Sequence, residues 1–179
     1  MSVLDEVRGA NESYVSQFDK GDLPMPPGRQ FAVLTCMDAR IDPARALGLE
    51  EGDAHVIRNA GGIATDDAVR SLVISHHLLG TREAFVIGHT DCGMLTFDND
   101  QLREILRERQ GCDATHVDFQ PFPDVAARVA ASVRRVRESG LLPDDYAFHP
   151  FVYDVATGHL EPVEAGELGA SGQKALAQA

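Results

Sequence analysis

The sequence predicts an α/β fold: a mostly parallel central sheet of about four strands flanked by helices, with a C-terminal hairpin or antiparallel edge strand and an N-terminal helical arm. Three observations lead to this prediction. Short apolar runs that suit buried strands end at Cys36, Arg58 and Gly88. Segments with apolar residues at helical spacing separate these runs. Strands that alternate with helices form parallel sheets, and their carboxyl ends meet at one edge.

The first element is an amphipathic helix expected over residues 2–18. Ser2 and Asp5 have the spacing of a capping box. The apolar residues that fall near one face of this helix are Leu4, Val7, Tyr14 and Phe18. A Pro-rich stretch at 24–28 then interrupts the chain. We interpret residues 2–20 as a helical arm placed to lie on a partner subunit.

Two strands are expected next, joined by a short helix. The run 30–36 is apolar throughout and suits a strand buried on both faces. Asp42 and Pro43 are typical of a helix start, so a short helix is expected over 42–47. The second strand is expected at 54–58. The glycines of 59–62 then allow the backbone to approach another group closely.

The remaining elements continue the alternation and end in a pair of strands. Capping residues, apolar stripes and terminal glycines predict three more helices, at 65–78, at 98 or 99 to 111, and at 125–140. Further strands are expected at 83–88, 151–155 and 159–163, the last two as a hairpin or as one strand with an extension. Residues 1–163 are expected to form one domain, and the tail 164–179, rich in Gly and Ala, is expected to be flexible.

Composition excludes several classes of function. The net charge of −12 disfavours nucleic acid and anionic membranes as partners, because both bind clustered Lys and Arg. The apolar runs are too short to span a bilayer, and the N-terminus lacks the pattern of a signal peptide, so a cytoplasmic location is expected. Three cysteines in a reducing compartment favour a metal or catalytic role over disulfides.

The predicted sheet edge brings together residues that bind metals. Cys36 follows the first strand, and His89 and Cys92 follow the third strand along the chain. Two thiolates and one imidazole are a ligand set that Zn²⁺ prefers. Three protein ligands leave the fourth position of a tetrahedron open, which is typical of catalytic zinc.

Asp38 and Arg40 follow Cys36 at alternate positions, so all three can face one pocket in an extended stretch. Arg40 can hold the Asp38 carboxylate by charge-assisted hydrogen bonds. The carboxylate then has two options. It can accept a hydrogen bond from a zinc-bound water, or it can bind the open zinc position itself as a conditional fourth ligand and close the site.

Three segments together resemble the β-class carbonic anhydrases, most closely a short branch of mycobacterial and actinobacterial type: Cys36-Met-Asp-Ala-Arg40, Arg58-Asn-Ala-Gly-Gly62 and His89-Thr-Asp-Cys-Gly93. The resemblance implies a zinc lyase, a carbonate dehydratase, that reversibly hydrates CO2 to bicarbonate. It implies zinc ligands at Cys36, His89 and Cys92, and a zinc-bound hydroxide oriented by the Asp38–Arg40 dyad. It further implies a substrate pocket near Gly62 and Gly93, and a homodimer or dimer of dimers in which the N-terminal helix embraces the partner.

Two alternatives stay open at the level of sequence. Similar proteins that hydrolyse carbonyl sulfide or carbon disulfide use the same zinc frame, and the metal motif does not separate these linear substrates from CO2. Many β-class members carry a Gln that lines the CO2 pocket nine residues before the first zinc cysteine. This chain has Pro27 at that position, so it departs from the family pattern in the substrate pocket. A noncatalytic zinc or redox-sensing protein is the second alternative, with Cys36 and Cys92 as a reversible disulfide. The presence of Asp38 and Arg40 disfavours it, because a sensor needs neither.

Overall fold

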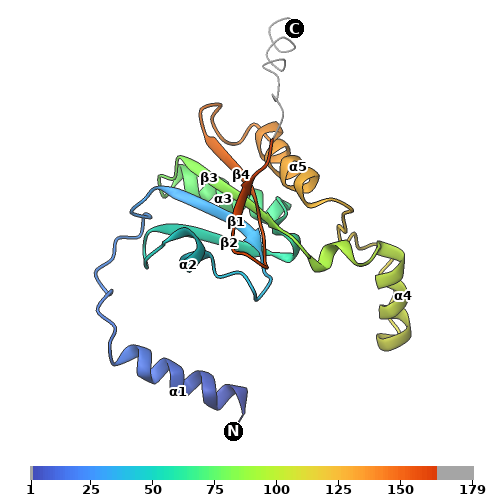
Figure 1. Ribbon diagram of the computed structural model, residues 1–179, viewed down its shortest axis with the longest axis horizontal. Helices are drawn as coiled ribbons and strands as arrows, with labels where there is room; N and C mark the ends of the chain where they lie inside the picture. The colour runs from blue at the N-terminus through green and yellow to red at the C-terminus, as the bar shows by residue number, and fades with distance from the viewer. Residues whose placement is uncertain (1, 165–179) are drawn as a thin grey trace, which may run out of the picture.

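The computed structural model describes residues 2–164 of the chain (Figure 1). Its centre is a five-stranded sheet of order β2-β1-β3-β4-β5. The parallel strands are β1 (Phe31–Cys36), β2 (Ala54–Asn59), β3 (Glu83–His89) and β4 (Ala147–Tyr153). The last strand, β5 (Leu160–Pro162), pairs with β4 in the antiparallel direction. The predicted fold class is therefore confirmed, including the antiparallel edge strand.

Within residues 2–164, five α-helices accompany the sheet, and a side-chain cap begins each one. They are α1 (Val3–Val15), α2 (Pro43–Leu47), α3 (Asp66–His77), α4 (Asn99–Gln110) and α5 (Val125–Glu138). Two 3₁₀ turns, η1 (Ala60–Gly62) and η2 (Gly93–Leu95), follow β2 and β3. No helix within residues 2–164 is long and apolar enough to cross a membrane. The predicted tail lies, from residue 165 onward, outside the described residues.

The strand β4 differs most from the sequence-based expectation. A strand was expected at 151–155, but β4 begins at Ala147 and ends at Tyr153. Pro150 lies in its middle, opposite Val86 of β3, and proline is unusual in an interior strand because it has no N–H to donate. Pairing with the whole of β3 overrides this local signal. Another difference is that α1 ends at Val15 and so does not reach Phe18.

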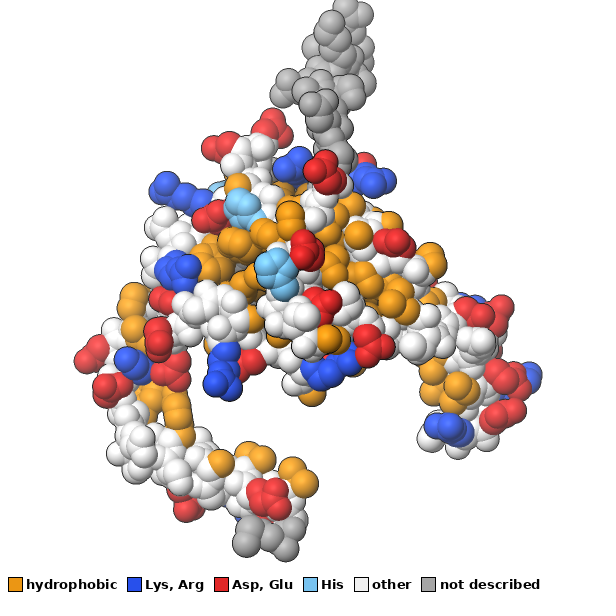
Figure 2. Space-filling view, viewed as in Figure 1, with side chains coloured by type: hydrophobic (Ala, Val, Ile, Leu, Met, Phe, Trp, Pro, Cys, Tyr) orange, Lys and Arg blue, Asp and Glu red, His pale blue; other side chains and the backbone are white. Residues whose placement is uncertain are grey.

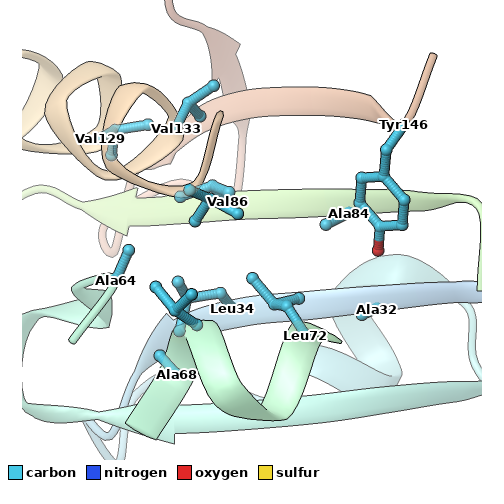
Figure 3. Close-up of a cluster of buried hydrophobic side chains, with 12 residues drawn as sticks. Ala32, Leu34, Ala64, Ala68, Leu72, Ala84, Val86, Val129, Val133 and Tyr146 are labelled. Atoms are coloured by element: carbon cyan, nitrogen blue, oxygen red, sulfur yellow. The ribbon is translucent and has the colours of Figure 1, made fainter. Parts of the chain in front are cut away.

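Helices α3 and α5 cover one face of the sheet and form the main core with it. Figure 3 shows Ala68 and Leu72 of α3 and Val133 of α5 directed toward Leu34 and Val86 of β1 and β3. Among residues 2–164, α2 and the adjoining segment pack on the opposite face, through Leu47 and Leu49. Aromatic residues of β3 and β4 on that face are only partly buried. The sheet is therefore covered less completely on its second face than a sheet buried on both sides would be.

The helices α1 and α4 project from this body (Figure 1). Neither contains a buried residue. Leu4 and Val7 of α1 are more than half exposed, and Figure 2 shows hydrophobic side chains along this helix and at the centre of the same view. Exposed apolar surface of this kind is typical of a site where another protein chain binds.

Candidate metal centre

The carboxyl ends of β1 and β3 bring together the three predicted metal ligands. Cys36 is the last residue of β1, His89 is the last residue of β3, and Cys92 immediately precedes η2. Their side chains are almost fully buried, with exposed fractions of 5%, 1% and 2%. Their ligand atoms all lie within 4.8 Å of one another. Parallel neighbouring strands explain this arrangement, because residues far apart in sequence then end at the same edge.

The imidazole of His89 is oriented for a metal. Its Nδ1 lies 2.9 Å from the carbonyl oxygen of Thr90. A carbonyl only accepts, so Nδ1 carries the proton and Nε2 presents a lone pair. Nε2 is buried and has no hydrogen-bond partner among residues 2–164. A buried acceptor without a partner is costly, and a metal ion held together with two thiolates would satisfy it. The donor set therefore fits Zn²⁺.

The two cysteines differ in their affinity for a proton when no metal is bound. Burial raises the pKa of the Cys36 thiol, but the adjacent His89 side chain and the backbone amides of Asp38 and Gly61 outweigh burial and bring the pKa down to about 7. The Gly61 amide lies 3.3 Å from Sγ of Cys36. Burial raises the pKa of the Cys92 thiol to about 11, and the nearby sulfur of Cys36 adds to the effect. A bound cation would favour both thiolates.

Asp38 and Arg40 form the ion pair expected from their spacing. The Nε of Arg40 lies 3.0 Å from Oδ1 of Asp38, and its Nη2 lies 2.8 Å from Oδ2. The Arg40 amide also donates to Oδ1, at 2.9 Å. These hydrogen bonds hold the pKa of Asp38 well below its usual range. Oδ2 lies 3.8 Å from Nε2 of His89, so the carboxylate is adjacent to the ligand cluster.

Two further residues contact this pair, and sequence analysis did not predict either contact. Arg58, at the end of β2, donates to the carbonyl oxygens of Cys36 and Asp38 at 2.9 and 2.7 Å. Asp91 accepts from Arg40, with 2.6 Å between Oδ2 and Nη1. Arg58 begins one of the three segments that resemble the β-class family, and this membership could have marked it as a residue of the site. Asp91 lies in the turn between His89 and Cys92, and its contact with Arg40 depends on the tertiary structure.

The two glycines predicted near the substrate have different surroundings. Gly62 has φ +63°, and a Cβ at this position would lie 2.9 Å from the Cys36 nitrogen and 2.9 Å from the Thr35 carbonyl carbon. Gly62 therefore packs against the backbone of β1, beside the ligands. Gly93 is exposed, and a Cβ there would meet nothing within 4 Å. Of the two, only Gly93 borders open space. The third cysteine, Cys112, is exposed in the loop after α4, outside this cluster.

Comparison with known proteins gives a consistent picture. The carbonic anhydrase family model matches residues 31–160. The chain is 46% identical to β-carbonic anhydrase 1 of Mycobacterium tuberculosis over 163 residues, covering 91% of this chain and 99% of that protein. The crystal structure of a carbonic anhydrase from Streptococcus mutans superposes with a TM-score of 0.87 at 44% identity, over 91% of this chain and 98% of that one. A carbon disulfide hydrolase of Acidithiobacillus thiooxidans is 31% identical over 90% of this chain and 91% of that protein.

Proposed function

The chain belongs to the β-carbonic anhydrase family, and from this premise we propose that it catalyses the reversible hydration of CO2 to bicarbonate at a zinc ion held by Cys36, His89 and Cys92. One observation carries the proposal: a buried Cys-His-Cys cluster has a carboxylate, already paired with arginine, at its edge. When bound, zinc would supply a Lewis acid that lowers the pKa of water and so activates it for attack on CO2.

The residues around the cluster have separate tasks in this proposal. His89 donates through Nδ1 to Thr90 and keeps its Nε2 lone pair directed at the metal position. Asp38 accepts a hydrogen bond from the reacting water and so orients it, and its Arg40 partner fixes the direction of that bond. Arg58 holds the backbone between Cys36 and Asp38. Gly93 borders the open side, where a small linear substrate has room to approach.

The position of Asp38 bears on the second role that its sequence allowed, as a fourth metal ligand. Both carboxylate oxygens are engaged by Arg40. This pairing favours the arrangement in which Asp38 acts on water and leaves the fourth metal position open. Closure would require the carboxylate to give up hydrogen bonds from the Arg40 side chain.

The test is CO2 hydration by the zinc-loaded protein, followed by stopped-flow with a pH indicator. The same preparation should be assayed with carbonyl sulfide and carbon disulfide. Turnover of CO2 that exceeds turnover of both sulfur compounds supports the proposal. The Asp38→Ala variant, with its zinc content measured, separates loss of chemistry from loss of metal.

Carbon disulfide hydrolysis is the second candidate, because relatives with that name align over most of this chain at 31% and 33% identity. The higher identity and coverage of the carbonic anhydrases favour CO2. Preferential turnover of carbon disulfide or carbonyl sulfide would replace the leading proposal. If the isolated protein held no stoichiometric zinc and Cys36 and Cys92 formed a reversible disulfide, the redox-sensing alternative would be favoured over both.

We also propose that the chain acts in the cytoplasm as a homodimer or dimer of dimers, with the arm 2–20 lying on the partner. Support comes from α1, which projects from the body with exposed apolar residues, and from the incompletely covered second face of the sheet. Sedimentation of the intact chain and of a variant lacking residues 1–20 tests this. A smaller assembly on truncation is expected, and an intact chain that sediments as a monomer would contradict the proposal.

A further inference from the structure

Asp91 lies between two of the metal ligands but points away from them. It follows Thr90 in the turn that joins His89 to Cys92, and its side chain is 77% exposed. Its backbone has φ +52°, a left-handed conformation that non-glycine residues rarely adopt and that Asp and Asn tolerate best. Within residues 2–164, its carboxylate accepts a hydrogen bond only from Arg40, so the side chain does not close its own turn.

The left-handed conformation presents two oxygens of Asp91 to the same guanidinium. Oδ2 lies 2.6 Å from Nη1 of Arg40, and the backbone oxygen lies 2.8 Å from Nη2. Asp38 occupies the other edge of the group, through Nε and Nη2. A guanidinium is planar, so contacts along both edges fix its plane as well as its position.

This contact joins the two halves of the candidate site. Arg40 comes from the segment after β1 and Asp91 from the segment after β3. Arg40 is 46% exposed, and a long exposed side chain keeps considerable rotamer freedom unless a second partner restricts it. Asp91 is that second partner.

We propose that Asp91 is a positioning residue that holds Arg40 in place and thereby keeps the Asp38 carboxylate on Arg40 and off the metal. The inference rests on the proposed function. Oδ2 of Asp38 lies 3.8 Å from Nε2 of His89, so only a small movement separates the carboxylate from the metal position. Arg58 holds the Asp38 carbonyl, which leaves the side chain as the part that can move. Loosening Arg40 therefore favours closure of the site by Asp38.

The test compares Asp91→Gly with Asp91→Asn. Both residues tolerate the left-handed turn and both lose the charge, but only asparagine keeps an oxygen that can accept from Arg40. The proteins are loaded with Co²⁺, and thiocyanate affinity is measured through the visible absorption of the cobalt. Thiocyanate has to compete with Asp38 for the open position. We expect thiocyanate to bind Asp91→Gly about fivefold more weakly than Asp91→Asn, which is the size of one net hydrogen bond from Arg40 to the amide oxygen.

The same pair of variants is then made in an Asp38→Ala background. There the difference in thiocyanate affinity should vanish, because no carboxylate remains to close the site. Asp67→Ala is the control, since it removes a comparably exposed partner of an arginine, Arg70, on α3. Thermal unfolding and cobalt content of each variant show that folding and metal loading are intact.

Equal affinities of Asp91→Gly and Asp91→Asn would overturn the proposal. A difference that persists without Asp38 would also overturn it, because Asp91 would then act through the turn itself. The outcome is separable from the proposed function, since the cobalt measurement needs no turnover. A wild-type enzyme that fails to hydrate CO2 would reject the function and leave the anion measurement interpretable.

Discussion

Replacing Gly62 by alanine tests whether the close approach of η1 to the sheet supports the metal centre. Gly62 has φ +63°, and its added Cβ would lie 2.9 Å from both the Cys36 nitrogen and the Thr35 carbonyl carbon, and 3.1 Å from the Ile87 oxygen. These neighbours are backbone atoms of β1 and β3, so no side chain can rotate away to make room. Either η1 or the strand ends must move.

The expected cost has two parts. A left-handed conformation costs an alanine about 1–2 kcal/mol. Overpacking a well-packed region costs about 1–3 kcal/mol more. We therefore expect Gly62→Ala to lower the free energy of unfolding by about 2–5 kcal/mol. Zinc affinity should fall as well, because Cys36 is among the atoms that must shift and Gly61, the adjacent residue, donates to its sulfur.

Urea unfolding of the zinc-free proteins measures the first effect, and competition with a zinc-binding dye measures the second. Gly93→Ala is the matched control, since a Cβ there meets nothing within 4 Å and its backbone is not left-handed. We expect its unfolding free energy to stay close to that of the wild type. If Gly62→Ala and Gly93→Ala unfolded at the same urea concentration with the same slope, the packing argument would be wrong.

Three further predictions concern the ligands, the dyad and the remaining thiol. The free energy of unfolding should rise with the concentration of free zinc, by about 4 kcal/mol at a thousandfold excess over Kd. A thermal unfolding midpoint that is independent of zinc would exclude a zinc site formed in the folded state. Asp38→Asn should lower kcat/KM for CO2 about 100-fold with zinc content unchanged, and near wild-type turnover would remove Asp38 from the mechanism. Iodoacetamide should alkylate exposed Cys112 in the zinc-loaded protein and leave Cys36 and Cys92 unmodified, as mass spectrometry can check, with activity retained.

Local sequence signals were sufficient for most helices and for the parallel strands β1, β2 and β3. Asp98 and Gly111, for example, delimit α4 as their capping preferences predict. The start of β4 could not be predicted in the same way. Its residues 147–150 include a proline and lack a clear alternation, and they become a strand because β3 offers a complete partner. Pairing between strands is a long-range property that a local window does not contain.

For the candidate site, the sequence by itself determined the kinds of chemical groups and their attachment to strand ends. Cysteine and histidine at the ends of predicted parallel strands indicated zinc, and the spacing of Asp38 and Arg40 indicated an ion pair. Only the tertiary structure decided how these groups are held. The contacts of Arg58 with the Asp38 backbone and of Asp91 with Arg40 cross between segments 20 and 51 residues apart. Such contacts depend on strand order and on one left-handed turn, and neither leaves a periodic pattern in the chain.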